Sequence, residues 1–186
     1  RFYGMPLCEI KIMSVLNAVC PFMFQELERL VEADTHETVT VKHYRDPGVD
    51  NWSNHNIKYV KLALYEGRRE VAYVVSNAVG SSMTDWFQST RVIASSWSDV
   101  TARGTYNVFS ITGYLSHLRR FYINKSHGGC PKDRGYMAVS DSKVQGCQWD
   151  SHPIYPQFLY SKINSADNWE RFMFGRADFL AIFVYI

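Results

Sequence analysis

The residues best suited to chemistry in this sequence are tryptophans that stand beside carboxylate or amide side chains. An indole ring next to Asp or Asn is the elementary sugar site, because the ring packs on the CH groups of a sugar while its neighbours bind the hydroxyls. The pairs of this kind are Asp85 with Trp86, Trp97 with Asp99, Trp149 with Asp150, and Asn168 with Trp169. The alternative is that each ring closes one end of a β domain and belongs to its core.

Aspartates are frequent in the C-terminal half of the chain, and loop carboxylates are ligands that calcium prefers. They are Asp133, Asp141, Asp150, Asp167 and Asp178. Calcium is therefore the metal ion that would fit a sugar-binding loop here. None of these residues follows the spacing of a known calcium-binding loop, and turn or cap positions account for them equally well.

The familiar enzymatic motifs are missing: the sequence has no GxSxG elbow, no HExxH, no P-loop and no dinucleotide fingerprint. His127 and Cys130 stand close enough in sequence to suggest a Cys/His nucleophile. A catalytic thiolate needs a low pKa and a base held beside it. A disulfide between Cys130 and Cys147, 17 positions later, is the competing interpretation and the one we favour. We predict no catalytic activity.

The four cysteines fall into two separated pairs, Cys8 with Cys20 and Cys130 with Cys147. Four thiols allow three pairings, and we expect the two local ones because each closes a short loop. Neither pair has the ligand spacing of a zinc site. Asn51 and Asn124 each open an Asn-X-Ser sequon, the acceptor site for N-glycosylation. Disulfides and sequons together predict a secreted glycoprotein.

Composition agrees with a single globular domain spanning residues 1–186, since 46% of the residues are hydrophobic and 20% are charged. A net charge of +2, with dispersed Lys and Arg, argues against nucleic acid as the partner. No apolar run reaches transmembrane length. The chain begins at Arg1 without a signal-like stretch, as we expect of a processed mature chain.

These residues need a scaffold, and the hydrophobic pattern predicts an all-β one. Strands are expected over 9–13, 38–44, 57–65, 70–76, 91–94, 106–112, 119–124, 136–139, 157–161 and 178–186, with one short N-terminal helix over 22–33. The segment from Glu66 to Arg69 has the turn chemistry of a hairpin. The last run, from Asp178 to Ile186, has no breaker and is expected inside a sheet. About nine or ten short strands without a βαβ rhythm predict an antiparallel β-sandwich or barrel.

Three stretches resemble a secreted domain of invertebrates, of molluscs especially, and the likeness covers roughly Lys58 to Ile186. The stretches are 120–136 with its Gly-Gly-Cys-Pro core, Cys147-Gln148-Trp149, and 175–184. The shared motif is structural, so the resemblance carries no catalytic residue. The size, the sequons and the aromatic richness are similar in character to subunits of gastropod egg perivitellins, glycosylated oligomers that store protein and carry carotenoid.

Two functions follow as hypotheses. The first is a non-enzymatic, lectin-like domain that binds glycans through loop Trp, Asp and Asn residues. The second is an oligomeric storage or carrier protein, made of like or unlike subunits, that holds a flat apolar ligand such as a carotenoid or lipid. The two differ in where they place the aromatic rings: at an exposed sugar site, or on a surface that packs against a subunit or an apolar ligand.

Overall fold

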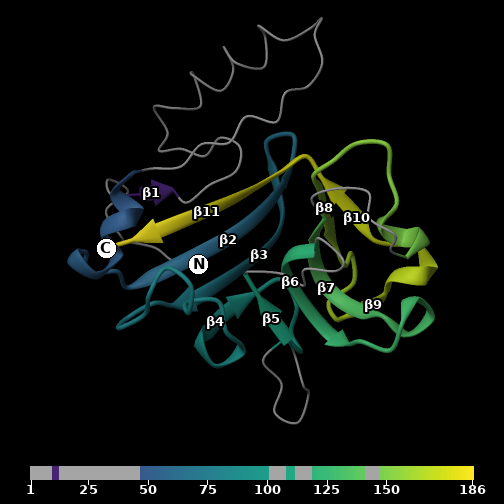
Figure 1. Cartoon of the computed structure of the whole chain (residues 1–186), viewed down its shortest axis with the longest axis horizontal. Helices are drawn as coiled ribbons and strands as arrows, with labels where there is room; N and C mark the ends of the chain where they lie inside the picture. The colour runs from purple at the N-terminus through teal and green to yellow at the C-terminus, as the bar shows by residue number, and fades with distance from the viewer. Residues whose placement is uncertain (1–9, 13–46, 101–107, 112–118, 141–146) are drawn as a thin grey trace, which may run out of the picture.

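Two antiparallel β-sheets make up the part of the chain that the structure describes (Figure 1). The structure is a computed structural model, and it describes residues 10–12, 47–100, 108–111, 119–140 and 147–186. The expected fold class is confirmed in its sandwich form, because the two sheets share one apolar core instead of closing into a barrel.

The first sheet has five strands in the order β1-β11-β2-β3-β4. Their bounds are Ile10–Ile12 for β1, Phe179–Tyr185 for β11, Tyr59–Glu66 for β2, Arg69–Asn77 for β3 and Val92–Ser95 for β4. The C-terminal strand β11 lies between β1 and β2, inside the sheet as its unbroken apolar sequence predicts. The predicted hairpin is present: β2 and β3 pair in antiparallel register around Gly67, whose φ of 56° favours glycine.

The second sheet has the strand order β10-β8-β7-β6-β5, and β9 pairs with β7 beside this path. Their bounds are Gly175–Ala177 for β10, Gln157–Tyr160 for β8, Arg134–Ser140 for β7, Arg119–Ser126 for β6, Val108–Ser110 for β5 and Asp167–Asn168 for β9. The sequence did not predict β9 and β10. Each is at most three residues long, too short for an alternating pattern to be recognised.

Short 3₁₀ helices connect the strands. They are η2 at Pro47–Asn54, η3 at Ser89–Arg91, η4 at Cys130–Lys132, η5 at Gln148–Asp150 and η6 at Trp169–Arg171. None of the helices in the described part of the chain is long and apolar enough to cross a membrane. The predicted helix 22–33, the predicted strand 38–44 and the predicted Cys8–Cys20 pair lie outside the described residues.

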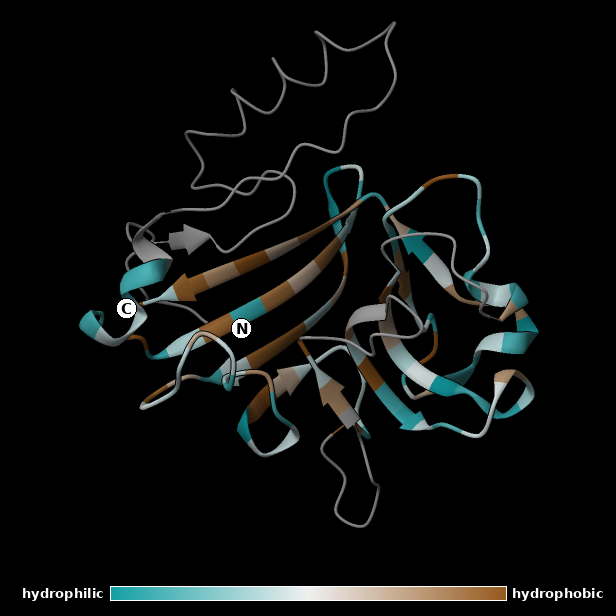
Figure 2. Cartoon of the chain, viewed as in Figure 1, coloured by the Kyte–Doolittle hydropathy of each residue, from teal (hydrophilic) through white to brown (hydrophobic). Residues whose placement is uncertain are grey.

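The core lies between the two sheets and follows from the period of two along each strand. On β2, Val60, Leu62 and Leu64 point inward and are at most 1% exposed. Met137 on β7 and Phe158 on β8 meet them from the second sheet. Figure 2 shows the same arrangement as brown runs along β11, β2 and β3, with a hydrophilic β2–β3 turn at their end.

Candidate functional site

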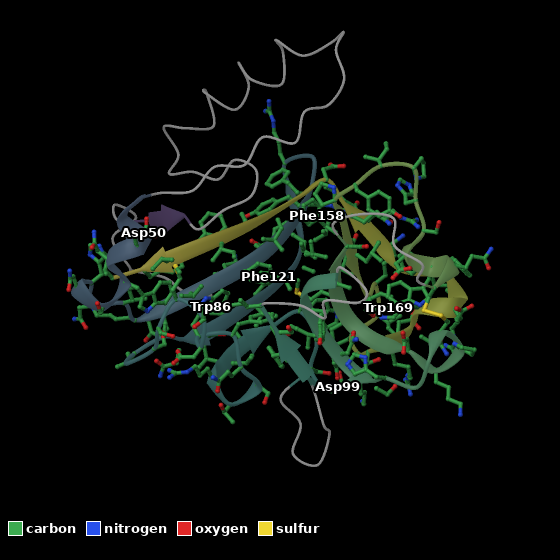
Figure 3. The ribbon with its side chains drawn as sticks, in the orientation of Figure 1. Asp50, Trp86, Asp99, Phe121, Phe158 and Trp169 are labelled. Atoms are coloured by element: carbon green, nitrogen blue, oxygen red, sulfur yellow. A yellow bond between two sulfur atoms is a disulfide. The ribbon has the colours of Figure 1, made fainter. Side chains whose placement is uncertain are left out.

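The tryptophans predicted to bind sugar are buried. Trp86 and Trp169 are 0% exposed, Trp149 is 1% exposed and Trp97 is 2% exposed. Figure 3 shows Trp86 and Phe121 among the side chains between the sheets, and Trp169 near the disulfide. A sugar stacks on the open face of a ring, and none of these four rings presents an open face in this structure.

The polar neighbours of these rings bind backbone N–H groups or a lysine. Asp85 accepts a hydrogen bond from the backbone N–H of Ser82 at 2.7 Å, as a turn residue does. Asp99 pairs with Lys125 at 2.7 Å. Asn168 caps η6 by accepting from the backbone N–H of Glu170 at 2.9 Å.

A second group of buried residues covers the outer face of the second sheet, and we call it the stapled cluster. It consists of Trp149, Trp169, Leu159, Phe174 and the disulfide between Cys130 and Cys147. The two indole rings stack with centroids 5.5 Å apart. Asp150, which follows Trp149, is itself only 6% exposed. The disulfide confirms the favoured pairing of these two cysteines, and it removes the thiolate that a Cys130 nucleophile would need.

The fold around the stapled cluster requires glycine at two positions, one in the Gly-Gly-Cys-Pro stretch and one shortly after it. Gly129 has a φ of 82°, a conformation that residues with a side chain rarely adopt. Gly135 is needed for space instead, because a Cβ there would lie 2.4 Å from Oδ1 of Asn124 and 2.8 Å from the Trp169 ring. Gly129 is thus required for its backbone conformation, and Gly135 is required for close packing.

The two sequons differ in exposure. Asn51 is exposed on η2, so its glycosylation stays a prediction. Asn124 is 2% exposed on β6, and its Nδ2 lies 3.3 Å from Nδ1 of His127. A glycan on that nitrogen would require the side chain to leave the fold, so the predicted modification of Asn124 does not fit this structure. Calcium gains no support either: within the described residues no three His, Cys, Asp or Glu side chains gather around a common point.

A polar pocket of about 490 Å³ opens where the two sheets meet, and charged and polar side chains line it. The β2–β3 hairpin contributes Glu66, Arg69 and Glu70. The segment after β4 contributes Ser96 and Trp97, so one predicted site residue does line the pocket. The end of β8 and the loop that follows it contribute residues 160–164.

Each of the two pocket carboxylates is held in place by one cation and one phenol. Glu66 accepts a hydrogen bond from the Tyr160 hydroxyl and pairs with Arg69 at 3.4 Å. Glu70 pairs with Lys61 at 2.6 Å and accepts from the Tyr65 hydroxyl at 3.2 Å. The hairpin turn is held as well, because Asp178 accepts from the backbone N–H of Gly67 at 2.5 Å. The carboxylates therefore have fixed positions before any ligand arrives.

Tyr160 lines the pocket but is itself buried, with 5% of its surface exposed. Its ring lies directly over Gly175 of β10, where an added Cβ would stand 2.1 Å from Cζ of the ring. Burial, and then the hydrogen bond to Glu66, raise the pKa of Tyr160 to about 12. The hydroxyl therefore keeps its proton and donates to Glu66 over the whole physiological range.

Hydrogen bonds between distant segments brace the other walls. The Trp97 indole N–H donates to the carbonyl of Ser161 at 3.1 Å. Asn164 accepts from the backbone N–H of Ser98 at 2.8 Å, and the Ser161 hydroxyl donates to the carbonyl of Ser165 at 2.7 Å. Trp97 thus contributes to the site by positioning the 161–164 loop, and its ring stays in the core.

Sequence reasoning missed most of this pocket. Glu66 and Arg69 looked like turn residues of a hairpin, and Tyr160 looked like one aromatic residue of a strand. Glu66 and Tyr160 are 94 positions apart, so no local spacing relates them. The only available signal was the cluster of charged residues at the tip of a strong hairpin, which normally marks a solvated turn.

Comparison with known proteins adds no family to this picture: no family model, no curated protein and no solved structure matches the chain.

Proposed function

We propose that this protein is a non-enzymatic carbohydrate-binding domain that holds its sugar in the polar pocket between the β2–β3 hairpin and the 161–164 loop. One observation carries the proposal: hydroxyl, amide, carboxylate and guanidinium groups converge there. Sugars need many directional hydrogen bonds, and these groups supply them. The lectin-like hypothesis is therefore kept, but its residues move from the loop tryptophans to this pocket.

The rigidity of the pocket supports binding. Glu66 and Glu70 are each fixed by two partners, and the 161–164 loop is tied to Trp97 and Ser98. A site whose polar groups are already oriented loses less conformational entropy when a ligand enters. About 490 Å³ also falls within the usual range for small-ligand sites, roughly 300–1,000 Å³.

The absence of catalysis is part of the proposal, and the pairing of the carboxylates supports it. A general acid or base must give up or take a proton at the reacting bond. Glu66 is held by Arg69 and the Tyr160 hydroxyl, and Glu70 is held by Lys61 and the Tyr65 hydroxyl. Carboxylates fixed in this way are suited to orienting the hydroxyls of a bound sugar.

A glycan array followed by isothermal titration of the best ligand tests the proposal. We expect a sugar to bind the purified protein, and we expect Arg69→Gln to weaken that binding about tenfold, the usual effect of losing a hydrogen bond from a charged group. Arg68→Gln is the matched control, because Arg68 occupies the same turn but does not line the pocket. Failure to bind across a broad array would refute the proposal, as would equal weakening by both substitutions.

One feature favours the second candidate function, an oligomeric storage or carrier protein. The face of the first sheet that points away from the core carries Tyr65, Tyr73, Phe183 and Tyr185 around Ala63. The rings of Tyr65 and Phe179 stack there with centroids 4.9 Å apart. Such a face suits packing against like or unlike subunits, or against a flat apolar ligand such as a carotenoid or lipid.

Size-exclusion chromatography and an absorption spectrum of protein from its natural source separate the two candidates. A carrier should elute as a multimer and should yield a pigment or a lipid on extraction. A colourless, ligand-free monomer would remove this second candidate.

Secretion is tested on the same material by enzymatic deglycosylation. A shift in electrophoretic mobility after this treatment would indicate that Asn51 was glycosylated in the secretory pathway.

A further inference from the structure

Two carboxylates and two cations line the polar pocket, and both carboxylates are already paired. Glu66 pairs with Arg69 at 3.4 Å, and Glu70 pairs at 2.6 Å with Lys61, which does not line the pocket. Lys162 lines the same pocket, is exposed, and forms no ion pair within the part of the chain that the structure describes. The positive charge of Lys162 is therefore the charge that the pocket leaves for a ligand.

The hydrogen-bonding groups show the same bias toward donors. The Lys162 ammonium offers three N–H donors, and Arg69 uses one of its five N–H groups on Glu66 while its side chain is 77% exposed. Oδ1 of Asn164 accepts from Ser98, and its Nδ2 donates to none of the described residues. In contrast, the carboxylate oxygens of Glu66 already accept from Tyr160 and Arg69. A ligand that fits this arrangement must bring acceptors and negative charge.

We propose that the pocket selects an acidic sugar, one that carries a carboxylate or a sulfate, with Lys162 as the main counter-charge and Arg69 and Asn164 as additional donors. This inference rests on the proposed carbohydrate-binding function and adds the class of the ligand. Lys162 and Asn164 are close in sequence on a loop that Trp97 and Ser98 brace. Both residues line the pocket from this braced loop.

The test compares sugars that differ only in charge. Oligogalacturonate and its methyl ester have the same rings and linkages, and sulfated and desulfated carrageenan oligosaccharides provide the second pair. We expect one charged member to bind about tenfold more tightly than its neutral counterpart, because a charge-assisted hydrogen bond is worth about that much. Raising NaCl from about 0.05 M to about 0.5 M should reduce the difference, since salt screens an exposed ion pair.

Lys162→Gln isolates the residue responsible. Lys162 is on the surface, so the variant should fold; its thermal transition checks this. We expect it to bind the acidic sugar only as well as wild type binds the neutral one, so that the preference for the charged member of each pair is lost. Lys132→Gln is the charge-matched control, because Lys132 lies on η4 and does not line the pocket.

The outcomes separate this inference from the function on which it rests. Equal binding of charged and neutral sugars would overturn the inference and leave the carbohydrate-binding proposal intact. Binding of no sugar at all would overturn both. Competition by inorganic sulfate as strong as that of the free acidic sugar would show a simple anion site, and would refute the sugar part of the inference.

Discussion

The stapled cluster and the polar pocket are built on the same strand, yet they differ in almost every property. On β8, Leu159 points outward into the stapled cluster, while its neighbour Tyr160 points the other way and lines the pocket. The cluster consists of aromatic rings closed by a disulfide. The pocket consists of charged and hydroxyl groups held by ion pairs and phenols.

The comparison teaches that the most conspicuous side chains here serve the scaffold and less conspicuous ones offer the chemistry. A Trp beside Asp or Asn attracts attention in the sequence, but Trp149 and Trp169 pack against each other with no open face. The charged tip of a hairpin attracts little attention in the sequence, but it supplies three side chains to the pocket. The division predicts that substitutions in the cluster reduce stability, whereas substitutions in the pocket reduce affinity.

The largest effect is expected from Trp169→Ala in the stapled cluster. Trp169 is 0% exposed and contacts the rings of Trp149 and Phe174. Removing a buried ring of this size costs about 3–5 kcal/mol of unfolding free energy. Urea titration followed by circular dichroism measures the loss. Trp169→Phe is the milder control, since it keeps a ring in the same place. A fold as stable as wild type would show that the cluster is not part of the scaffold.

Replacing Cys130 and Cys147 together by Ser should have the next largest effect. The cross-link closes a loop with a sequence separation of 17 residues, which is worth about 3 kcal/mol in the chain-entropy model. The loss should appear in the same urea titration, and mild reduction of the wild-type protein should reproduce it. Affinity for the pocket ligand should be unchanged in the folded fraction. Lost binding in a fully folded variant would contradict the separation of cluster and pocket.

The sequence predicted the sheets better than it predicted the site, and the reason is physical. Strands such as β2 and β11 can be recognised in the sequence by local alternation or by an unbroken apolar run. This is because each residue's environment depends on its immediate neighbours in the pleat. The disulfide pairing was also local. The sandwich core and the hairpin therefore followed from short stretches of sequence.

The site depends on contacts between distant segments, and no local sequence pattern indicates these contacts. Trp97 reaches the carbonyl of Ser161 across 64 positions, and Tyr160 reaches Glu66 across 94. The burial of each Trp depends likewise on which loop folds over it. The same holds for Asn124, whose sequon is complete in the sequence although its side chain is buried in the fold.

The smallest effect concerns the hydroxyl that joins the two sheets at the pocket. Tyr160→Phe keeps the ring over Gly175 and removes the hydrogen bond to Glu66, so it should cost about 1–2 kcal/mol at neutral pH, near the value for a hydrogen bond to a charged group. It should also weaken ligand binding, because Glu66 loses one of the two partners that fix it.

The stability difference between wild type and Tyr160→Phe should depend on pH, because the pKa of Tyr160 is raised in the folded state. The folded state holds the Tyr160 proton with a pKa of about 12, against an ordinary value near 10, so folding favours the neutral phenol. The stabilisation is complete below pH 10 and is lost as the pH rises from about 10 to about 12. Urea titrations of wild type and Tyr160→Phe at increasing pH should therefore show a stability difference that is constant up to about pH 10 and then shrinks. Tyr65 and Tyr185 also have raised pKa values because they are buried, but both proteins contain them and their contributions cancel. A difference that stayed constant through pH 12 would mean that the Tyr160 proton is not held by Glu66, and the pocket would lose the contact that joins its two sheets.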